Sequence, residues 1–303
     1  MTLAQLQAFV TVIESGSFTT ASEVLGITQS AVSHALASLE AELGVILIQR
    51  DRAGLSLTDV GQRVILQARE MLARAETIRQ EAAATRGLET GKLRLGSLPS
   101  ITARFLPGVL RIFRQRYPKV EIVLLEGTDQ EVRAWIDARM VDIGVVTLPT
   151  EGVDVTPIAH DEFLVMVPEA HMLAKHSLIR IESLAHEQFL LCTGGCGPLI
   201  HALFDKAKVR FQVQLEVREI AAVLAMVQEE MGITIIPEMA LPSQLPAGIK
   251  ALHLQPTAWR HLALAVPSRE TMSPAANMFL QQAQQWGLLQ GFLQVGDESE
   301  KFM

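Results

Sequence analysis

The sequence predicts an N-terminal winged helix-turn-helix, a long linker helix and a C-terminal α/β domain of two lobes. Three observations predict this order. Two short helical patterns meet at Gly26, apolar residues follow heptad spacing over residues 64–85, and strand patterns alternate with helical ones beyond residue 91. With 303 residues, 49% of them hydrophobic and 19% charged, the chain can bury more than one core.

The helix-turn-helix occupies residues 18–37. In its first helix, small and apolar residues recur at three- and four-residue spacing as far as Gly26, which suits the left-handed end of a helix. Thr28 can then cap the second helix with its hydroxyl. The expected buried stripe of the second helix is Ala31, Val32, Ala35, Leu36 and Leu39. A second helix placed in this way enters a DNA major groove.

The opposite face of the second helix carries short donors and acceptors, which suit base edges and nearby phosphates. The solvated face of an ordinary three-helix core could have the same composition, so the neighbouring segments decide between the two interpretations. The candidate DNA contacts are Thr19, Thr28, Gln29, Ser30, Ser33, His34, Arg50 and Arg52.

The flanking segments complete a winged domain over residues 1–58. Thr2 and Gln5 have the spacing of a capping box at the start of a first helix, which ends at Gly16. Its expected inward stripe is Leu3, Leu6, Phe9, Val10 and Ile13. After the second helix of the motif, two short apolar runs surround a glycine-containing turn, which predicts the hairpin of a wing.

The charge of this domain is unusual for a DNA-binding protein. Residues 1–58 contain two basic and five acidic residues, a net charge of −3. Because neutralising phosphates supplies much of the affinity for DNA, a single copy should bind weakly. Affinity must then come from helix N-termini, hydroxyls, the two wing arginines and several copies acting together. The charge pattern therefore requires at least a dimer.

The linker helix, residues 59–87, supplies a dimerisation surface. It contains no proline, and its residues at alternating steps of four and three follow the coiled-coil period. These residues are Val64, Ala68, Met71, Ala75, Ile78, Ala82 and Thr85. The alternative is a single amphipathic helix that lies on its own domain.

Residues 1–61 closely resemble the DNA-binding domain of LysR-type transcriptional regulators. The matching stretches are LQAFVTVIESGSFTTASEVLGITQSAVSHALASLEAELGVILIQR and LSLTDVG. The resemblance implies a dimer formed through the linker helix. At position 34 the family often carries arginine where this chain has His34, so this position could read a base or a phosphate.

The sequence pattern of residues 88–303 predicts the α/β domain. Strands at 92–97, 120–126 and 142–146 alternate with helices at 103–116 and 129–140, an order that favours a parallel sheet. The second set of predicted elements comprises strands at 163–167, 189–192, 212–217 and 233–236 and helices at 198–208 and 220–230. Residues 260–266 and 275–286 could return to the first sheet. The last fifteen residues fit no element.

These elements predict two lobes joined by crossings near Asp161 and Ala265. Lobe I comprises residues 91–161 and 266–303, and lobe II comprises residues 162–265. The arrangement resembles the effector-binding module of the same family, which is similar to periplasmic solute-binding proteins. The matching features are the strand at 92–97, Leu106-Pro107, Tyr117-Pro118, Asp142-Ile143-Gly144 and the run from Gly232 to Pro237.

A ligand should bind between the lobes, beyond the carboxyl ends of the strands. Hydroxyl groups and free backbone N–H groups there would favour a small polar, anionic effector. The candidate effector contacts are Ser97, Ser100, Thr128 and Thr193, with Thr147 as a weaker one. Helix capping or turn formation would also explain each of these residues.

Cys192 and Cys196 raise the alternative of a thiol-based redox sensor within the same family, since one branch senses peroxide with a cysteine pair in this lobe. The pair in that branch is more widely spaced, and a buried, reduced thiol is the simpler interpretation. No metal-ligand spacing accompanies the cysteines. Carboxylates such as Glu126, Asp129 and Glu131 occur without a catalytic motif, so we expect no enzyme. A solute-binding protein for transport is opposed by the lack of a signal-peptide pattern.

The sequence thus predicts a ligand-responsive regulator that binds double-stranded DNA at an interrupted inverted repeat. We expect a dimer assembling further into a tetramer, a small-molecule co-inducer, no other cofactor, and RNA polymerase as a further partner. With a net charge of −7 and no apolar run that could span a bilayer, the chain should be cytoplasmic and have no membrane partner.

Overall fold

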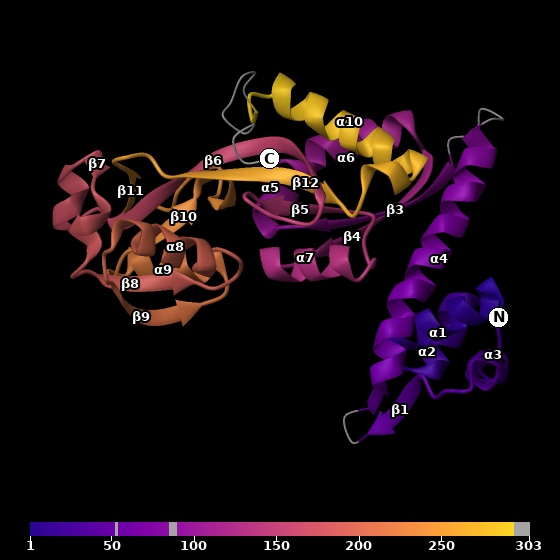
Figure 1. The fold of residues 1–303 in the computed structure, drawn as a ribbon. Helices are drawn as coiled ribbons and strands as arrows, with labels where there is room; N and C mark the ends of the chain where they lie inside the picture. The colour runs from indigo at the N-terminus through magenta and orange to yellow at the C-terminus, as the bar shows by residue number, and fades with distance from the viewer. Residues whose placement is uncertain (52–53, 85–89, 294–303) are drawn as a thin grey trace.

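The computed structural model describes residues 1–51, 54–84 and 90–293 (Figure 1). The first part of the chain is a winged helix-turn-helix. Its elements are α1 (Leu3–Ser15), α2 (Phe18–Leu25), α3 (Gln29–Leu43), β1 (Ile48–Asp51) and β2 (Gly54–Leu57). Gly16, Gly26 and Gly44 end the three helices in the left-handed conformation. The local signals in the sequence therefore mark the ends of these helices correctly.

Most of the predicted stripes form the core of this domain. Leu6, Phe9, Leu36 and Leu39 pack together with Leu47, which precedes the wing. Two stripe residues were predicted wrongly. Leu3 is 40% exposed at the first residue of α1, and Ala31 is exposed because it lies on the first turn of α3, at the edge of the stripe.

A single long helix, α4 (Asp59–Ala84), leads from the winged domain along the side of the α/β domain (Figure 1). Its first half packs on α1, with Ala68 buried in the core of the winged domain. Further along the predicted seam, Met71 is 42% and Ile78 69% exposed. One part of the predicted seam is thus buried against the chain's own winged domain, and another part is exposed to solvent. Thr85 lies outside the described residues.

The described part of the α/β domain is built on one eight-stranded mixed sheet and a smaller two-stranded sheet. The strands of the large sheet are β3 (Thr90–Ser97), β4 (Lys119–Glu126), β5 (Ile143–Thr147), β6 (Asp154–Pro168), β7 (Leu178–Ile179), β10 (Thr234–Pro237), β11 (Ile249–Leu254) and β12 (Trp259–Val266). The small sheet contains β8 (Gln188–Cys192) and β9 (Gln212–Val217). The predicted parallel arrangement is confirmed, since β3 pairs in parallel with both β4 and β5.

Within residues 90–293, six helices and four short 3₁₀ turns surround these strands. The helices are α5 (Pro99–Arg104), α6 (Leu106–Arg116), α7 (Asp129–Asp137), α8 (Gly197–Ala207), α9 (Ile220–Gln228) and α10 (Pro274–Leu289). The turns are η1 (Met172–Lys175), η2 (Ile181–Leu184), η3 (Glu238–Ala240) and η4 (Arg269–Thr271). In lobe I, α6 and α10 lie on one face of the sheet and α7 on the other (Figure 1).

The two lobes share the long strand β6. Up to Glu162 it pairs with β12, and from Phe163 onward it pairs with β10 and β11, so the strand changes partners next to Asp161, where the sequence predicts a crossing. The second crossing was predicted wrongly. Ala265 pairs with Gly144 inside the sheet of lobe I, and the chain returns earlier, between the end of β11 and the start of β12.

Two helices also differ from the prediction. The helix predicted over residues 103–116 is divided at Phe105 into α5 and α6, with Pro107 in the first turn of α6. The helix predicted to reach Met140 ends at Asp137, because Arg139 adopts a left-handed backbone with φ of +55°. β7 and β11 were not predicted.

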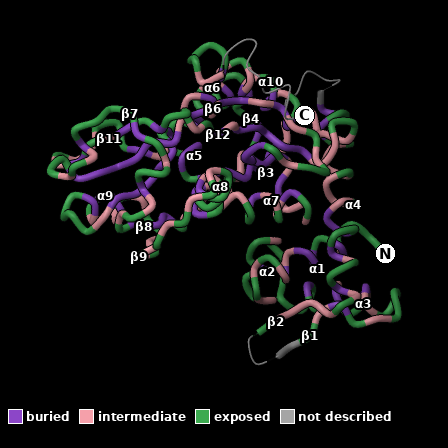
Figure 2. The backbone as a smooth tube through the Cα atoms, turned by 60° about the vertical axis from the view of Figure 1, so that its left-hand side comes forward, coloured by how far each residue is buried: buried purple, intermediate pink, exposed green. Residues whose placement is uncertain are grey.

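Buried residues follow the sheets and the inner sides of the helices, while exposed residues lie on the outer helix faces and loops (Figure 2). Lobe I has one hydrophobic core, and lobe II has two, one on each side of its strands. Among the described residues, no helix is both long and apolar enough to cross a membrane.

Candidate DNA-reading surface and effector cleft

The exposed side of α2 and α3 carries most of the predicted DNA contacts. Thr19, Thr28, Gln29, Ser30, Ser33 and His34 are all exposed. The Thr28 hydroxyl accepts a hydrogen bond from the Ala31 backbone N–H at 3.2 Å and lies 3.0 Å from the Ser30 hydroxyl. Thr28 therefore both caps α3 and faces solvent at its N-terminus, where backbone N–H groups favour a phosphate.

The wing is fixed against the start of α4. Thr58 donates its hydroxyl to the Ile46 carbonyl at 2.8 Å and accepts the Gly61 N–H at 3.0 Å. A Cβ on Gly61 would lie 2.1 Å from the Leu47 carbonyl oxygen, so only glycine permits this approach. Arg50 belongs to β1, but its side chain, like all of Arg52, lies outside the described residues.

A cavity of about 300 Å³ lies between the two lobes. It is lined by Pro99, Ser100, Ala103, Glu126, Gly127, Thr128, Gly194, Arg218, Glu219, Ile220, Ala221 and Ala240. We call this cavity the effector cleft. Its walls come from α5 and the start of α7 in lobe I, and from the start of α9 in lobe II. It lies at the ends of strands β3, β4 and β9, the edge at which ligands of α/β sheets generally bind.

The structure brings together two of the four predicted effector contacts. Ser100 and Thr128 line the cleft. Ser97 is fully buried and donates its hydroxyl to the Leu98 carbonyl, whereas exposed Thr193 is not part of the lining. Thr147 lies beneath, where its backbone N–H donates to Asp129 at 2.7 Å.

The N-terminus of α7 is occupied by a side chain of the same helix. The Glu131 carboxylate accepts both the backbone N–H and the hydroxyl of Thr128, at 2.7 and 2.9 Å. These hydrogen bonds, the backbone one first, lower the pKa of Glu131. This capping box was visible in the sequence as Thr128 followed by Glu131, and it leaves Thr128 less free for an anion than we expected. By contrast, α9 begins beside Arg218, and the side chain of its N-cap residue, Glu219, makes no capping hydrogen bond within the described part of the chain.

A buried ion pair that sequence reasoning missed supports the base of the cleft. Arg260 on β12 donates to both carboxylate oxygens of Asp161 on β6, at 2.7 and 2.8 Å. Arg260 also donates to the Ser100 hydroxyl at 3.2 Å, and Asp161 accepts the Met239 N–H at 2.9 Å. The pair thus ties α5, through Ser100, and η3, through Met239, to the two neighbouring strands β6 and β12. The available signal was Arg260, the one charged residue of β12, together with Asp161 just before the apolar second half of β6.

Asp129 lies close to this pair at the start of α7. Burial raises the pKa of its carboxyl, and the hydrogen bonds from Thr147 and the charges of Arg260 and Arg133 offset part of that rise. The base of the cleft therefore contains fixed charges of both signs beneath the polar groups that line it.

The two cysteines lie next to the cleft in lobe II. Cys192 ends β8, and Cys196 precedes α8; both are free and buried. A hydrogen bond from Cys196 lowers the pKa of the Cys192 thiol to about 7, and the same contact raises the pKa of Cys196. No cluster of three metal-ligating side chains occurs in the part of the chain that the structure describes.

This combination of winged helix-turn-helix, linker helix and two-lobed α/β domain defines a ligand-responsive DNA-binding protein. Residues 3–62 match the family model described as bacterial regulatory helix-turn-helix protein, lysR family, and residues 86–287 match the LysR substrate binding domain. The chain belongs to the LysR family of transcriptional regulators. It is a DNA-binding transcriptional regulator with an effector-binding domain.

Known proteins are similar to this chain over most of its length. The uncharacterized HTH-type transcriptional regulator YvbU of Bacillus subtilis (strain 168) is 39% identical over 287 residues, which cover 94% of this chain and 98% of that protein. A probable hydrogen peroxide-inducible genes activator of Mycobacterium avium is 30% identical, covering 80% of this chain and 79% of that protein. Full-length OxyR from Pseudomonas aeruginosa shares the fold, with a TM-score of 0.76, 23% identity, and coverage of 94% of this chain and 98% of that one. LysR-family regulators act on DNA as oligomers and are not enzymes.

Proposed function

We propose that this protein regulates transcription from an operator containing an interrupted inverted repeat, under the control of a small molecule bound in the effector cleft. The observation that carries the proposal is one continuous helix, α4, that joins an exposed polar recognition helix to a two-lobed domain with a cleft. The protein would act in the cytoplasm, where the DNA is. Its further partner would be RNA polymerase, whose activity at the promoter it would change.

The proposal is tested by selecting DNA from the source genome. Purified protein is incubated with sheared genomic fragments, and the bound fragments are sequenced after washes at low and raised salt. Fragments that survive high salt and share an interrupted inverted repeat upstream of genes would support the proposal. Recovery of all fragments equally, lost as salt rises, would refute it, because that is the signature of phosphate contacts alone.

Within the DNA-reading surface, we assign base contacts to the exposed face of α3 and phosphate contacts to its flanks. Gln29 lies one turn before Ser33 and His34 on α3, and all three are exposed and end in groups that can form hydrogen bonds with base edges. Thr19, Thr28, Ser30, Arg50 and Arg52 are assigned to positions nearer the phosphates. Two recognition helices one turn of DNA apart, or a multiple of it, would read the two half-sites.

The exposed apolar part of α4 is the proposed dimerisation surface. Met71 and Ile78 lie seven residues apart on the same face and are 42% and 69% exposed. In an Ile78→Asp variant, a charge at this seam should shift the protein toward monomer in sedimentation velocity. Gln67→Asp, at an exposed position off the seam, is the matched control, and equal behaviour of both variants would contradict this surface.

For the effector we propose a small metabolite that carries an anionic group. Arg218 and the uncapped start of α9 offer a cation and free backbone N–H groups on the lobe II side of the cleft. Glu126 and Glu219 line the same cleft, so a ligand that also presents hydrogen-bond donors fits best. A volume of about 300 Å³ is at the small end of ligand pockets. We propose binding without turnover, so a screen of small acids should find ligands that are recovered unchanged.

A second candidate function is peroxide sensing by the two cysteines, which the lowered pKa of Cys192 and its contact with Cys196 favour. The Cys192 thiolate would attack one peroxide oxygen, breaking the O–O bond and forming a sulfenic acid while the other oxygen leaves and takes up a proton as water. The Cys196 thiol would then displace that hydroxyl as a second water and form a disulfide. Thiol titration before and after one equivalent of peroxide tests this: loss of two thiols supports it, and no loss refutes it.

A further inference from the structure

The two ends of helix α7 lie at two different sites, the effector cleft and the linker helix. At its N-terminus, Thr128 lines the effector cleft and Asp129 holds the end of β5. At its C-terminus, the Ala138 carbonyl accepts a hydrogen bond from Arg69 of the linker helix at 3.3 Å. Nine residues at 1.5 Å each make α7 about 14 Å long. One short helix therefore spans from the effector cleft to the linker helix.

This helix is held tightly on the sheet of lobe I. Val132 and Ile136 are fully buried against β3 and β5, where Gly96 and Gly144 lie side by side. A Cβ on Gly144 would lie 2.5 Å from the Cδ1 atom of Ile136, so the missing side chain is what allows the close approach. Such dense packing transmits displacement instead of absorbing it. A movement at the cleft end of α7 should therefore reach its other end.

The contact between α7 and the linker helix also includes the winged domain. Arg69 is only 8% exposed, and its Nε donates to Glu14 of α1 at 3.2 Å. One arginine thus joins α1, α4 and the C-terminus of α7, where a cation is favoured by the helix dipole. Beside it, Arg139 pairs with Glu70 of α4 at 2.8 Å. We call Glu14, Arg69, Glu70, Ala138 and Arg139 the α7 joint.

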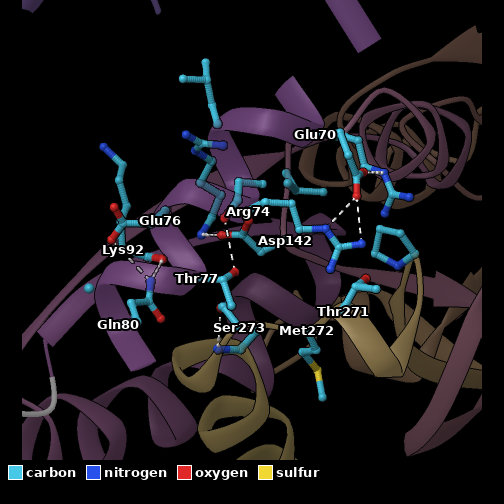
Figure 3. Close-up of a pocket in the computed structure, with 18 of the residues that line it drawn as sticks. Glu70, Arg74, Glu76, Thr77, Gln80, Lys92, Asp142, Thr271, Met272 and Ser273 are labelled. Atoms are coloured by element: carbon cyan, nitrogen blue, oxygen red, sulfur yellow. Dashed lines mark hydrogen bonds and ion pairs between the residues drawn. The ribbon is translucent and has the colours of Figure 1, made fainter. Parts of the chain in front are cut away.

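Space beside the joint allows the linker helix to change position. A cavity of about 580 Å³ lies between α4, β3 and the start of α10, and Figure 3 shows Glu70, Arg74 and Asp142 projecting into it. Its lining consists largely of charged and polar side chains. An arrangement of paired charges around a cavity can adopt a second set of pairings at little cost, unlike a packed apolar core.

We propose that α7 couples the effector cleft to the DNA-binding domain through the α7 joint. The inference rests on the proposed function, because it needs the cleft to bind an effector and the winged domain to bind an operator. Coupling between two sites is reciprocal, so operator DNA must change the affinity of the cleft for its effector by the same factor by which the effector changes the affinity for operator DNA. That reciprocity allows a test without knowledge of the effector.

The test is hydrogen exchange of the full-length protein with and without operator DNA selected from the genome, at saturating DNA. In the natural protein, operator should slow amide exchange about fivefold in cleft segments 126–131 and 194–198, the lower range of coupling between linked sites. The Arg69→Gln variant removes the three-way contact, and Arg139→Asn removes the Glu70 pair with a residue that tolerates the left-handed backbone. Both should bind operator yet lose the slowing in the cleft. If the Arg69→Gln variant does not fold, the Arg139→Asn variant alone tests the inference.

Arg133→Gln is the matched control. Arg133 lies on α7 as well, but its contacts are Asp137, Thr150 and the Glu151 carbonyl, all within lobe I. This variant should keep the operator-dependent slowing. Operator bound with unchanged exchange at the cleft, or slowing retained in the joint variants, would overturn the inference while leaving the proposed function intact. Failure to select any operator would refute the proposed function and this inference with it.

Discussion

Replacing Arg260 should destabilise the effector domain far more than replacing any exposed arginine. The guanidinium is 3% exposed, and it makes two hydrogen bonds to Asp161 and one to Ser100. In an Arg260→Met variant, Asp161 keeps the Met239 N–H as its one remaining partner in the structure. The change therefore leaves a buried, unpaired carboxylate at the crossing between the lobes.

The expected magnitude follows from these contacts. Stranding one member of a buried ion pair costs about 3–5 kcal/mol of unfolding free energy. The Asp161→Leu variant leaves the arginine buried and unpaired instead, and it should lose a similar amount of unfolding free energy. In the double variant neither charge of the pair remains, and what is left is the Met239 N–H without an acceptor, at about 1–3 kcal/mol, and the Ser100 hydroxyl without the Arg260 donor. The double variant should therefore be more stable than either single one.

Urea unfolding of the two single variants, the double variant and the natural protein measures this cycle. We expect a coupling free energy of at least about 3 kcal/mol between positions 161 and 260. Arg133→Met, at a partly exposed pair on α7, is the control and should cost about 1 kcal/mol or less. Single losses that simply add in the double variant would refute the reasoning, because they would mean that the pair does not act as a unit.

Three further predictions concern other parts of the chain. Ser33→Ala should relax base preference at one operator position, whereas Arg52→Ala should weaken all sequences alike, which binding to a panel of operator variants measures. Peroxide oxidation of Cys192 should rise about tenfold from pH 6 to pH 8, because its thiolate forms as the pH passes the pKa of about 7, and a flat stopped-flow profile would contradict this. Gly144→Ala should cost about 1–3 kcal/mol in thermal or urea unfolding, because its Cβ would overlap Ile136; an unchanged stability would mean that α7 is not tightly packed.

The sequence predicts the winged domain well because its signals are local. Gly26 ends one helix, Thr28 caps the next, and both act over a few residues. The strands β3, β4 and β5 of lobe I were also found by period alone, whereas the first half of β6 and the division between α5 and α6 were not. The exposed position of Ala31 shows the limit of such patterns, since a residue at the edge of a stripe can fall on either side.

The rest of the site depends on long-range pairing that no local pattern carries. Asp161 and Arg260 lie 99 residues apart and meet only because β6 and β12 are antiparallel neighbours. The same pairing places Ala265 inside lobe I and moves the second crossing. Thr128 is a different case. Its capping-box pattern with Glu131 is visible in the sequence, but capping and ligand binding compete for the same hydroxyl group.

Whether the protein recognises DNA sequence is tested most directly by comparing its affinity for the selected operator with that for a scrambled duplex, at about 50 and 200 mM salt. The acidic winged domain offers few phosphate contacts, so we expect a specificity ratio of about 10³ or more that persists at the higher salt. A ratio near one, with affinity that falls steeply as salt rises, would contradict the account, because the recognition helix would then contribute no base reading.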